Sequence, residues 1–166
     1  LAVSNLSEMG PGTRFHRVIA EPESIAADDK VRRLLLCSGK VYYDLVQERE
    51  NRGIKDVAIA RVEQLYPWPR QNILDQIARY PNAQIVWCQE EPANMGGWTF
   101  VLPRLINILE ELEREVTLPT YVGRKAAASP ATGLFKTHVK EQEELVDQAL
   151  TVDLGSIVQP FRRARQ

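Results

Sequence analysis

Short apolar runs alternate with helical patterns through most of this chain. The runs Arg33–Cys37, Val57–Val62 and Gln84–Cys88 have the length and composition of strands that are buried on both faces of a sheet. A fourth strand is expected over Val116–Val122. Because strands and helices alternate at this spacing, the sequence predicts an α/β fold in three layers, with a mostly parallel central sheet flanked by helices.

The predicted strands are each followed by a stretch in which apolar residues recur at helical spacing. The helices are expected over Lys40–Asn51, from Pro69 through Ala78, from about Trp98 to Arg114, and from about Lys136 to Leu150. Gly53 is well placed to end the first helix, because glycine readily adopts the left-handed conformation found there. The segment Glu63–Pro69 contains two prolines, which fit neither a helix interior nor a central strand, so a rigid loop is expected.

The length of 166 residues fits one domain with a substantial hydrophobic core. The chain begins at Leu1 without a methionine, and a polar stretch from Glu21 to Lys30 precedes the first apolar strand. We therefore expect residues 1–30 to be a linker or edge segment from an upstream domain. Residues 31–150 are expected to form the α/β domain, and residues 151–166 a C-terminal tail.

Charge, hydropathy and cysteine content argue against several classes of protein. The net charge of −1 gives the molecule no general attraction to nucleic acid or to an anionic membrane. No apolar run is long enough to cross a membrane, and no signal peptide opens the sequence. Cys37 and Cys88 lack the spacing of a zinc site or a disulfide framework. Buried free thiols in a reducing compartment are expected, either the cytoplasm or a mitochondrial matrix equivalent.

Polar residues follow the predicted strands at the points where the strands end. Because parallel strands bring their carboxyl ends to one edge of a sheet, where α/β folds build their sites, we expect these residues to share an edge. They are Ser38, Lys40, Arg61, Glu63, Gln64, Gln89, Glu90, Glu91 and Arg124. Ser38 and Lys40 precede a helix N-terminus, where an anion is welcome. The phosphate-loop glycines are missing, however, which favours a short turn with a solvated lysine.

The acidic segment from Gln89 to Gly97 is the most distinctive part of this edge. Glu90 and Glu91 are adjacent, so on a strand they point to opposite faces and do not form a paired acid and base. We expect one of them to accept hydrogen bonds from loop amides or from an arginine, with Arg61 reaching this region. Gly96 and Gly97 are expected to provide special backbone conformations or a close approach. The competing interpretation is a general base at this position.

No complete catalytic set is recognisable in the sequence. The two histidines, His16 and His138, have no nucleophile arrangement around them, and a structural or interface role is expected for His138. With two histidines and no metal-ligand spacing of Cys and His, the sequence does not predict a metal site either.

Four sequence blocks nevertheless carry a specific resemblance that runs along nearly the whole chain. They are Leu36–Leu45 (LCSGKVYYDL), Arg61–Pro67 (RVEQLYP), Trp87–Pro92 (WCQEEP), and Gly123–Arg124 together with Ala127–Ala131 (AASPA). With these blocks the chain resembles the C-terminal domain of 2-oxoglutarate dehydrogenase E1 components, which depend on thiamine diphosphate. The resemblance implies a transketolase C-terminal-type fold in which one strand of the sheet is reversed.

The resemblance also implies a function for the parent enzyme. That enzyme would decarboxylate 2-oxoglutarate in the tricarboxylic acid cycle and pass the succinyl group to the lipoyl arm of dihydrolipoyl succinyltransferase (E2). Thiamine diphosphate and magnesium would bind the upstream domains, because the Gly-Asp-Gly motif of the family is absent here. This domain would organise the E1 homodimer without being catalytic.

Two sets of edge residues are assigned candidate roles, and only the first set receives its role from the resemblance. Gln64, Gln89, Glu90, Glu91, Gly96 and Gly97 would form a structural or interface loop near the subunit contact. The candidates for an effector or anion site are Ser38, Lys40, Arg61 and Arg124. Two alternatives remain for the chain itself: a free-standing regulatory module that binds an adenine nucleotide or coenzyme A, and a purely structural dimerisation domain.

Overall fold

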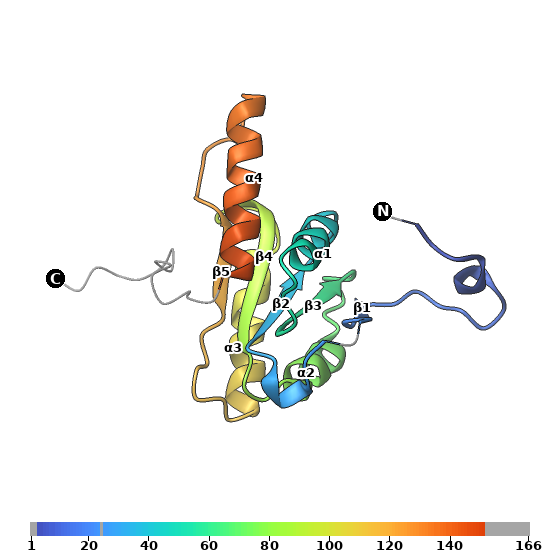
Figure 1. Cartoon of the computed structure of the whole chain (residues 1–166). Coiled ribbons are helices and arrows are strands. Elements are labelled where there is room, and N and C mark those ends of the chain that lie inside the picture. The colour runs from blue at the N-terminus through green and yellow to red at the C-terminus, as the bar shows by residue number, and fades with distance from the viewer. Residues whose placement is uncertain (1–2, 24, 152–166) are drawn as a thin grey trace.

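The computed structural model describes residues 3–23 and 25–151, and the predicted tail beyond Thr151 lies outside them. A five-stranded sheet forms its centre (Figure 1). The strands are β1 (Val18–Ile19), β2 (Arg33–Cys37), β3 (Val57–Val62), β4 (Gln84–Pro92) and β5 (Thr120–Arg124), in the order β1-β3-β2-β4-β5. All pairings are parallel except the one between β1 and β3.

Four α-helices cover the two faces of this sheet: α1 (Val41–Asn51), α2 (Arg70–Arg79), α3 (Trp98–Glu111) and α4 (Phe135–Leu150). Alternate strand residues point to opposite faces. Leu34 and Leu36 pack in one core with α2 and α3, while Leu35 and Cys37 pack in a second core with α1 and α4. The predicted three-layer α/β fold with one reversed strand is therefore confirmed.

The strand order places a topological switch between β2 and β4. From β2 the chain passes through α1 to β3 on one side, and from β4 it passes through α3 to β5 on the other. Open α/β sheets bind their ligands where the strand order reverses, outside the carboxyl ends of the strands. The carboxyl ends of β2 and β4 are therefore the natural place to look for a site.

Two predicted strand boundaries are wrong. The third strand continues past Cys88 to Pro92, so Glu90 and Glu91 lie on β4 and not in a loop after it. The last strand begins at Thr120 instead of Val116, and Val116 is exposed. An apolar side chain in that position contributed to the strand pattern without being buried.

The segment before β2 contributes an edge strand and two short 3-10 helices, η1 (Leu6–Met9) and η2 (Asp28–Lys30). The carboxylate of Glu21, close after β1, is buried and pairs with Arg49 of α1 at 2.5 Å. Part of the segment is thus built into the body of the domain. Its assignment as a linker from an upstream domain stays a prediction.

Candidate functional site

An ion pair lies across the switch point of the sheet. Lys40, between β2 and α1, extends its ammonium to within 2.8 Å of the Glu90 carboxylate on β4. The same ammonium lies 3.1 Å from Asp44 in the first turn of α1. The hydrogen bond to Glu90 raises the pKa of Lys40 above its ordinary value. Where related folds open a binding crevice, the two strand ends are here connected by an ion pair.

Polar contacts continue from this pair to helix α4. The amide of Gln142 donates to the Asp44 carboxylate at 2.8 Å and accepts from the Arg124 guanidinium at 3.2 Å. Asp44 is thereby shared between Lys40 and Gln142. The carboxyl ends of β2, β4 and β5 and helices α1 and α4 are joined in one network, which we call the edge network: Lys40, Asp44, Glu90, Arg124 and Gln142.

Arg124, at the end of β5, also has contacts beyond the edge network. Its guanidinium donates to the backbone oxygen of Glu90 at 2.9 Å and lies 3.1 Å from the Glu141 carboxylate. It also lies 3.1 Å from Nδ1 of His138. Since a guanidinium only donates hydrogen bonds, Nδ1 of His138 is the acceptor in this contact. The structural or interface role expected for His138 stays a prediction.

Gln89, and neither glutamate side chain, organises the acidic segment. Its buried amide oxygen accepts from the indole of Trp87 and from the backbone amide of Trp98, both at 2.9 Å. Its amide nitrogen donates to the backbone oxygen of Met95 at 2.7 Å, and to two further carbonyls of the segment at 3.2 Å. The expectation that Glu90 or Glu91 holds this segment is wrong: Glu90 pairs with Lys40, and Glu91 is exposed.

The backbone conformation and the close packing at Gly96 and Gly97 explain why this segment needs glycine at both positions. Gly96 has φ +65°, and a Cβ there would come within 2.9 Å of the Gln89 amide nitrogen. A Cβ on Gly97 would come within 2.9 Å of the Trp87 ring. The turn is therefore packed tightly on the side chains that define its shape.

Arg61 does not reach Glu90 or Glu91, and that prediction is wrong. Its guanidinium lies 3.5 Å from Glu63, donates to the hydroxyl of Tyr43 at 3.0 Å and stacks over the ring of Tyr42. The physical reason is the strand order, because β2 separates β3 from β4. The side chain of Gln64 likewise makes a contact within its own loop, because its amide donates to the backbone oxygen of Pro67 at 2.6 Å.

The cations proposed for an anion site are therefore engaged with other groups. Lys40 pairs with Glu90 and Asp44, Arg124 pairs with Glu141, and Arg61 lies against Glu63 and two tyrosines. Ser38 is exposed. An anion arriving at this edge would have to displace carboxylates that already occupy the cationic groups.

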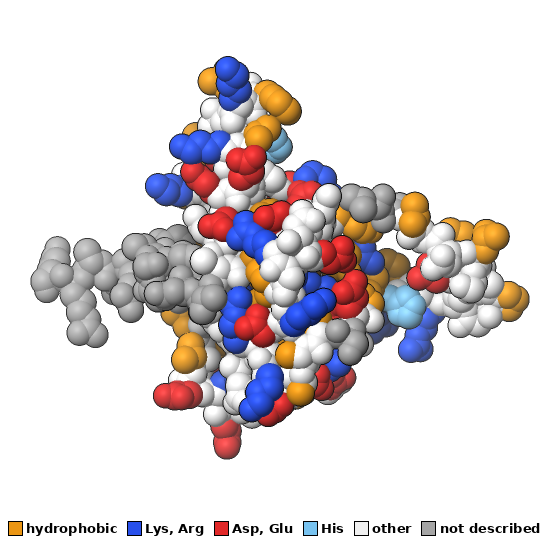
Figure 2. Space-filling view, in the orientation of Figure 1, with side chains coloured by type: hydrophobic (Ala, Val, Ile, Leu, Met, Phe, Trp, Pro, Cys, Tyr) orange, Lys and Arg blue, Asp and Glu red, His pale blue; other side chains and the backbone are white. Residues whose placement is uncertain are grey.

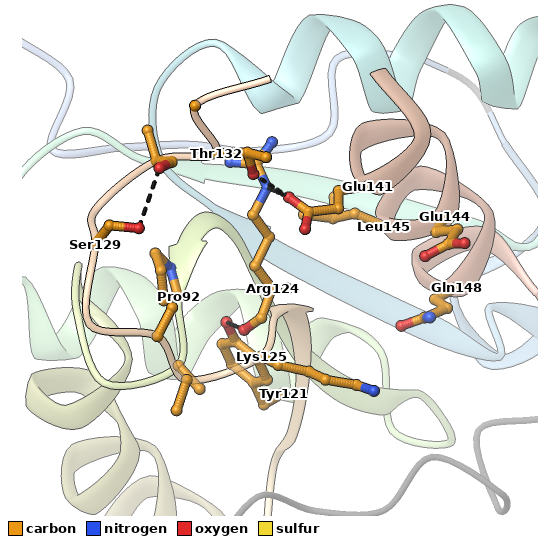
Figure 3. A pocket seen from close by; sticks show the side chains of 16 residues that line it. Pro92, Tyr121, Arg124, Lys125, Ser129, Thr132, Glu141, Glu144, Leu145 and Gln148 are labelled. Atoms are coloured by element: carbon orange, nitrogen blue, oxygen red, sulfur yellow. Dashed lines mark hydrogen bonds and ion pairs between the residues drawn. The ribbon is translucent and has the colours of Figure 1, made fainter. Parts of the chain in front are cut away.

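A cavity of about 820 Å³ lies beside Arg124, between the loop after β5 and helix α4 (Figure 3). Thr132 bonds Glu141 on one side of it. Asn94 holds the loop through two 3.0 Å hydrogen bonds with the backbone of Ala127. Burial raises the pKa of Tyr121 on the cavity floor, and its hydroxyl donates to backbone oxygens. The cavity thus lies between a constrained loop and α4. Both basic and acidic side chains line it.

The two cysteines are buried free thiols, as predicted. Cys37 and Cys88 are register partners on β2 and β4. Burial raises the pKa of Cys37 to about 12 and that of Cys88 well above its ordinary value. Because the thiolate is the nucleophilic form, neither side chain is activated for attack.

Two further findings concern residues 3–23 and 25–151. Within them, His, Cys, Asp and Glu side chains form no group of three or more that would hold a metal ion. No helix there combines the length and the apolar composition needed to cross a bilayer.

Four residues of the edge network (Lys40, Asp44, Glu90 and Arg124) and the first part of the acidic segment, Gln89–Pro92, fall in the sequence blocks that carried the resemblance. Comparison with known proteins agrees with the resemblance. The family described as 2-oxoglutarate dehydrogenase C-terminal matches residues 3–150. The chain belongs to this family. It is 45% identical over 157 residues to the 2-oxoglutarate dehydrogenase E1 components of Brucella anthropi and Brucella ovis, and 44% identical to that of Brucella abortus.

The chain corresponds to only a small part of those relatives. The aligned region covers 90% of this chain but 16% of each of them. Most of a relative's length therefore has no counterpart in this chain.

Proposed function

We propose that this chain serves as the C-terminal domain of an E1 component that decarboxylates 2-oxoglutarate in the tricarboxylic acid cycle and transfers the succinyl group to the lipoyl arm of its E2 partner. The observation that carries the proposal is the family match over residues 3–150, together with 45% identity to E1 components. The α/β architecture and the constrained acidic segment fit the same assignment.

In this proposal the domain is structural and not catalytic. The carboxylate of Glu90 is occupied by Lys40, which disfavours a free general base at the switch point. Both thiols are buried in their protonated form. Nδ1 of His138 faces the guanidinium of Arg124. The domain would instead help to organise the E1 homodimer, with the acidic segment near the subunit contact.

Thiamine diphosphate and magnesium belong to other domains in this proposal. Magnesium prefers oxygen ligands from carboxylates and from the substrate phosphates, and the described residues offer no cluster of the required kind. In this proposal the cofactor chemistry is assigned to the remainder of the E1 polypeptide. A cytoplasmic or matrix location and assembly with dihydrolipoyl succinyltransferase follow from the same proposal.

The test uses both this chain and the full-length protein that contains it. The full-length protein should release carbon dioxide from 2-oxoglutarate when thiamine diphosphate and magnesium are supplied. The isolated 166-residue chain should be inert and should give no heat of cofactor binding by calorimetry. Cofactor binding by the isolated chain, or a full-length protein that ignores 2-oxoglutarate, would contradict the proposal.

The effector site at Ser38, Lys40, Arg61 and Arg124 remains a secondary prediction. A ligand that binds only the folded state raises the melting temperature. Thermal unfolding with an adenine nucleotide or with coenzyme A separates an effector site from a purely structural edge. The engaged cations predict little shift, whereas a saturable rise would establish the effector site.

A further inference from the structure

The N-terminal end of α4 projects beyond the sheet (Figure 1). This end carries exposed apolar side chains. Leu134 is 72% exposed and Phe135 is 79% exposed, with Val139 beside them at 37%. We call these three residues the α4 tip. The other end of the same helix buries Leu145 and Leu150 in the core. The apolar residues of α4 therefore extend beyond the part of the helix that packs against the sheet.

The α4 tip forms one contiguous surface. Phe135 and Val139 are four residues apart and so lie on the same side of the helix. Lys136 and Lys140 flank them, and Figure 2 shows hydrophobic and basic side chains together at this projecting end. An exposed apolar group with a charged border is typical of a protein contact surface.

The tip is also held in place. Nearby on α4, His138 and Glu141 contact the Arg124 guanidinium, and Gln142 connects to α1 through Asp44. At the other end of the helix, Arg33 donates to the backbone oxygen of Ala149 at 2.6 Å. The helix thus presents its apolar tip in a fixed direction, which lowers the entropy lost when a partner binds.

We propose that the α4 tip is the docking surface for the remainder of the E1 polypeptide within the same subunit. This inference rests on the proposed function. The aligned region is 16% of the length of the relatives, so most of such a polypeptide is available to cover the tip. Lys140 lies 3.7 Å from Glu144 of its own helix, so charge complementarity at the tip rests mainly on Lys136, which favours an acidic residue beside the apolar centre of the partner surface.

Size argues for a tethered partner over a second copy of the domain. Stable interfaces between separate proteins use roughly 20–30 residues on each side, whereas the tip offers three apolar side chains. A covalent connection raises the effective concentration of the two surfaces, so a small apolar centre suffices between linked domains. The tip suits docking within one chain.

The experiment measures hydrogen–deuterium exchange in the full-length E1 at the α4 amides from His138 to Gln142. The Phe135→Glu variant should speed exchange there by roughly thirtyfold, the effect of losing a central aromatic anchor. Val116→Glu is the matched control, since Val116 is an exposed apolar residue beside the amino-terminal ends of the strands. It should leave α4 exchange unchanged.

Three outcomes would overturn the proposal. They are unchanged exchange in Phe135→Glu, equal acceleration in Val116→Glu, and wild-type protection that grows with protein concentration, which would assign the tip to a second copy. Exchange at the buried amides from Leu145 to Leu150 checks folding, and Phe135→Ser provides a milder variant. Because exchange does not depend on 2-oxoglutarate turnover, failure of docking is distinguishable from failure of the proposed activity.

Discussion

The two ends of helix α1 are held by the same kind of contact in opposite surroundings. At the C-terminal end, Arg49 pairs with Glu21 at 2.5 Å, and both side chains are almost completely buried. At the N-terminal end, Lys40 pairs with Glu90 at 2.8 Å, but the lysine side chain is 64% exposed. The distances are similar, so burial decides how much each pair matters.

The buried pair also satisfies the backbone of β3. Glu21 accepts from the amide of Ile59 at 2.8 Å, and Arg49 donates to the backbone oxygen of Val57 at 3.0 Å. Burial alone would lower the pKa of Arg49, but hydrogen bonding and charge from Glu21 outweigh it and raise the pKa. The pair fixes the segment before β2 to the body of the domain, whereas Lys40–Glu90 joins two surfaces that water already reaches.

The largest effect is expected from Arg49→Ala. The substitution leaves Glu21 buried without its cation, which costs on the order of 3–5 kcal/mol. Denaturant unfolding of this chain, followed by circular dichroism, measures the loss. The double replacement Arg49→Met with Glu21→Met should recover much of it, because no buried charge remains. A loss below about 1 kcal/mol for Arg49→Ala would contradict the claim that the buried pair contributes more to stability than the exposed Lys40–Glu90 pair.

A smaller loss is expected from Gln89→Ala, which sharpens the comparison by testing a buried group at the exposed edge. It leaves the Trp87 indole and the Trp98 amide without their acceptor, at a cost of about 2–3 kcal/mol. The matched control is Gln64→Ala, whose exposed hydrogen bond to Pro67 should be worth at most about 1 kcal/mol. Equal losses of unfolding free energy in the two variants would show that burial does not determine how much a hydrogen bond contributes.

The smallest effect is expected from Lys40→Ala, at most about 1 kcal/mol and less in high salt. The sign of its pH dependence follows from the raised pKa of Lys40, caused first by the hydrogen bond to Glu90. The contribution is complete below the ordinary pKa of 10.5 and is lost as the pH rises through the higher folded-state value. Unfolding of wild type and variant across alkaline pH should therefore converge. A difference that widens would contradict the pairing.

The fold was predictable where strands are buried on both faces. The runs in β2 and β3 are continuous and apolar because helices cover both sides of them. The predicted strand ends were wrong where burial on both faces no longer applies. Val116 is apolar but exposed, and β4 extends through polar residues because the Gln89 side chain finds partners within its own segment.

The site was only partly predictable. Lys40, Glu90 and Arg124 were placed at one edge correctly, since parallel strands share their carboxyl ends. The partner of Arg61 was not, because strand order depends on long-range packing that no local pattern records. Nothing in the sequence marks Glu21 as buried, as a lone carboxylate in a polar stretch looks like solvated surface.

The central claim is that the Glu90 carboxylate is engaged by Lys40 at the edge of the sheet and does not act in catalysis. The direct test is Glu90→Gln in the full-length E1, with the exposed Glu91→Gln as control, measuring the rate of 2-oxoglutarate decarboxylation alongside dimer mass and folding. We predict that the rate falls less than about tenfold in both variants. A fall on the order of 10²–10⁴-fold in Glu90→Gln, with the fold and dimer intact, is the size expected of a general acid or base and would contradict the account.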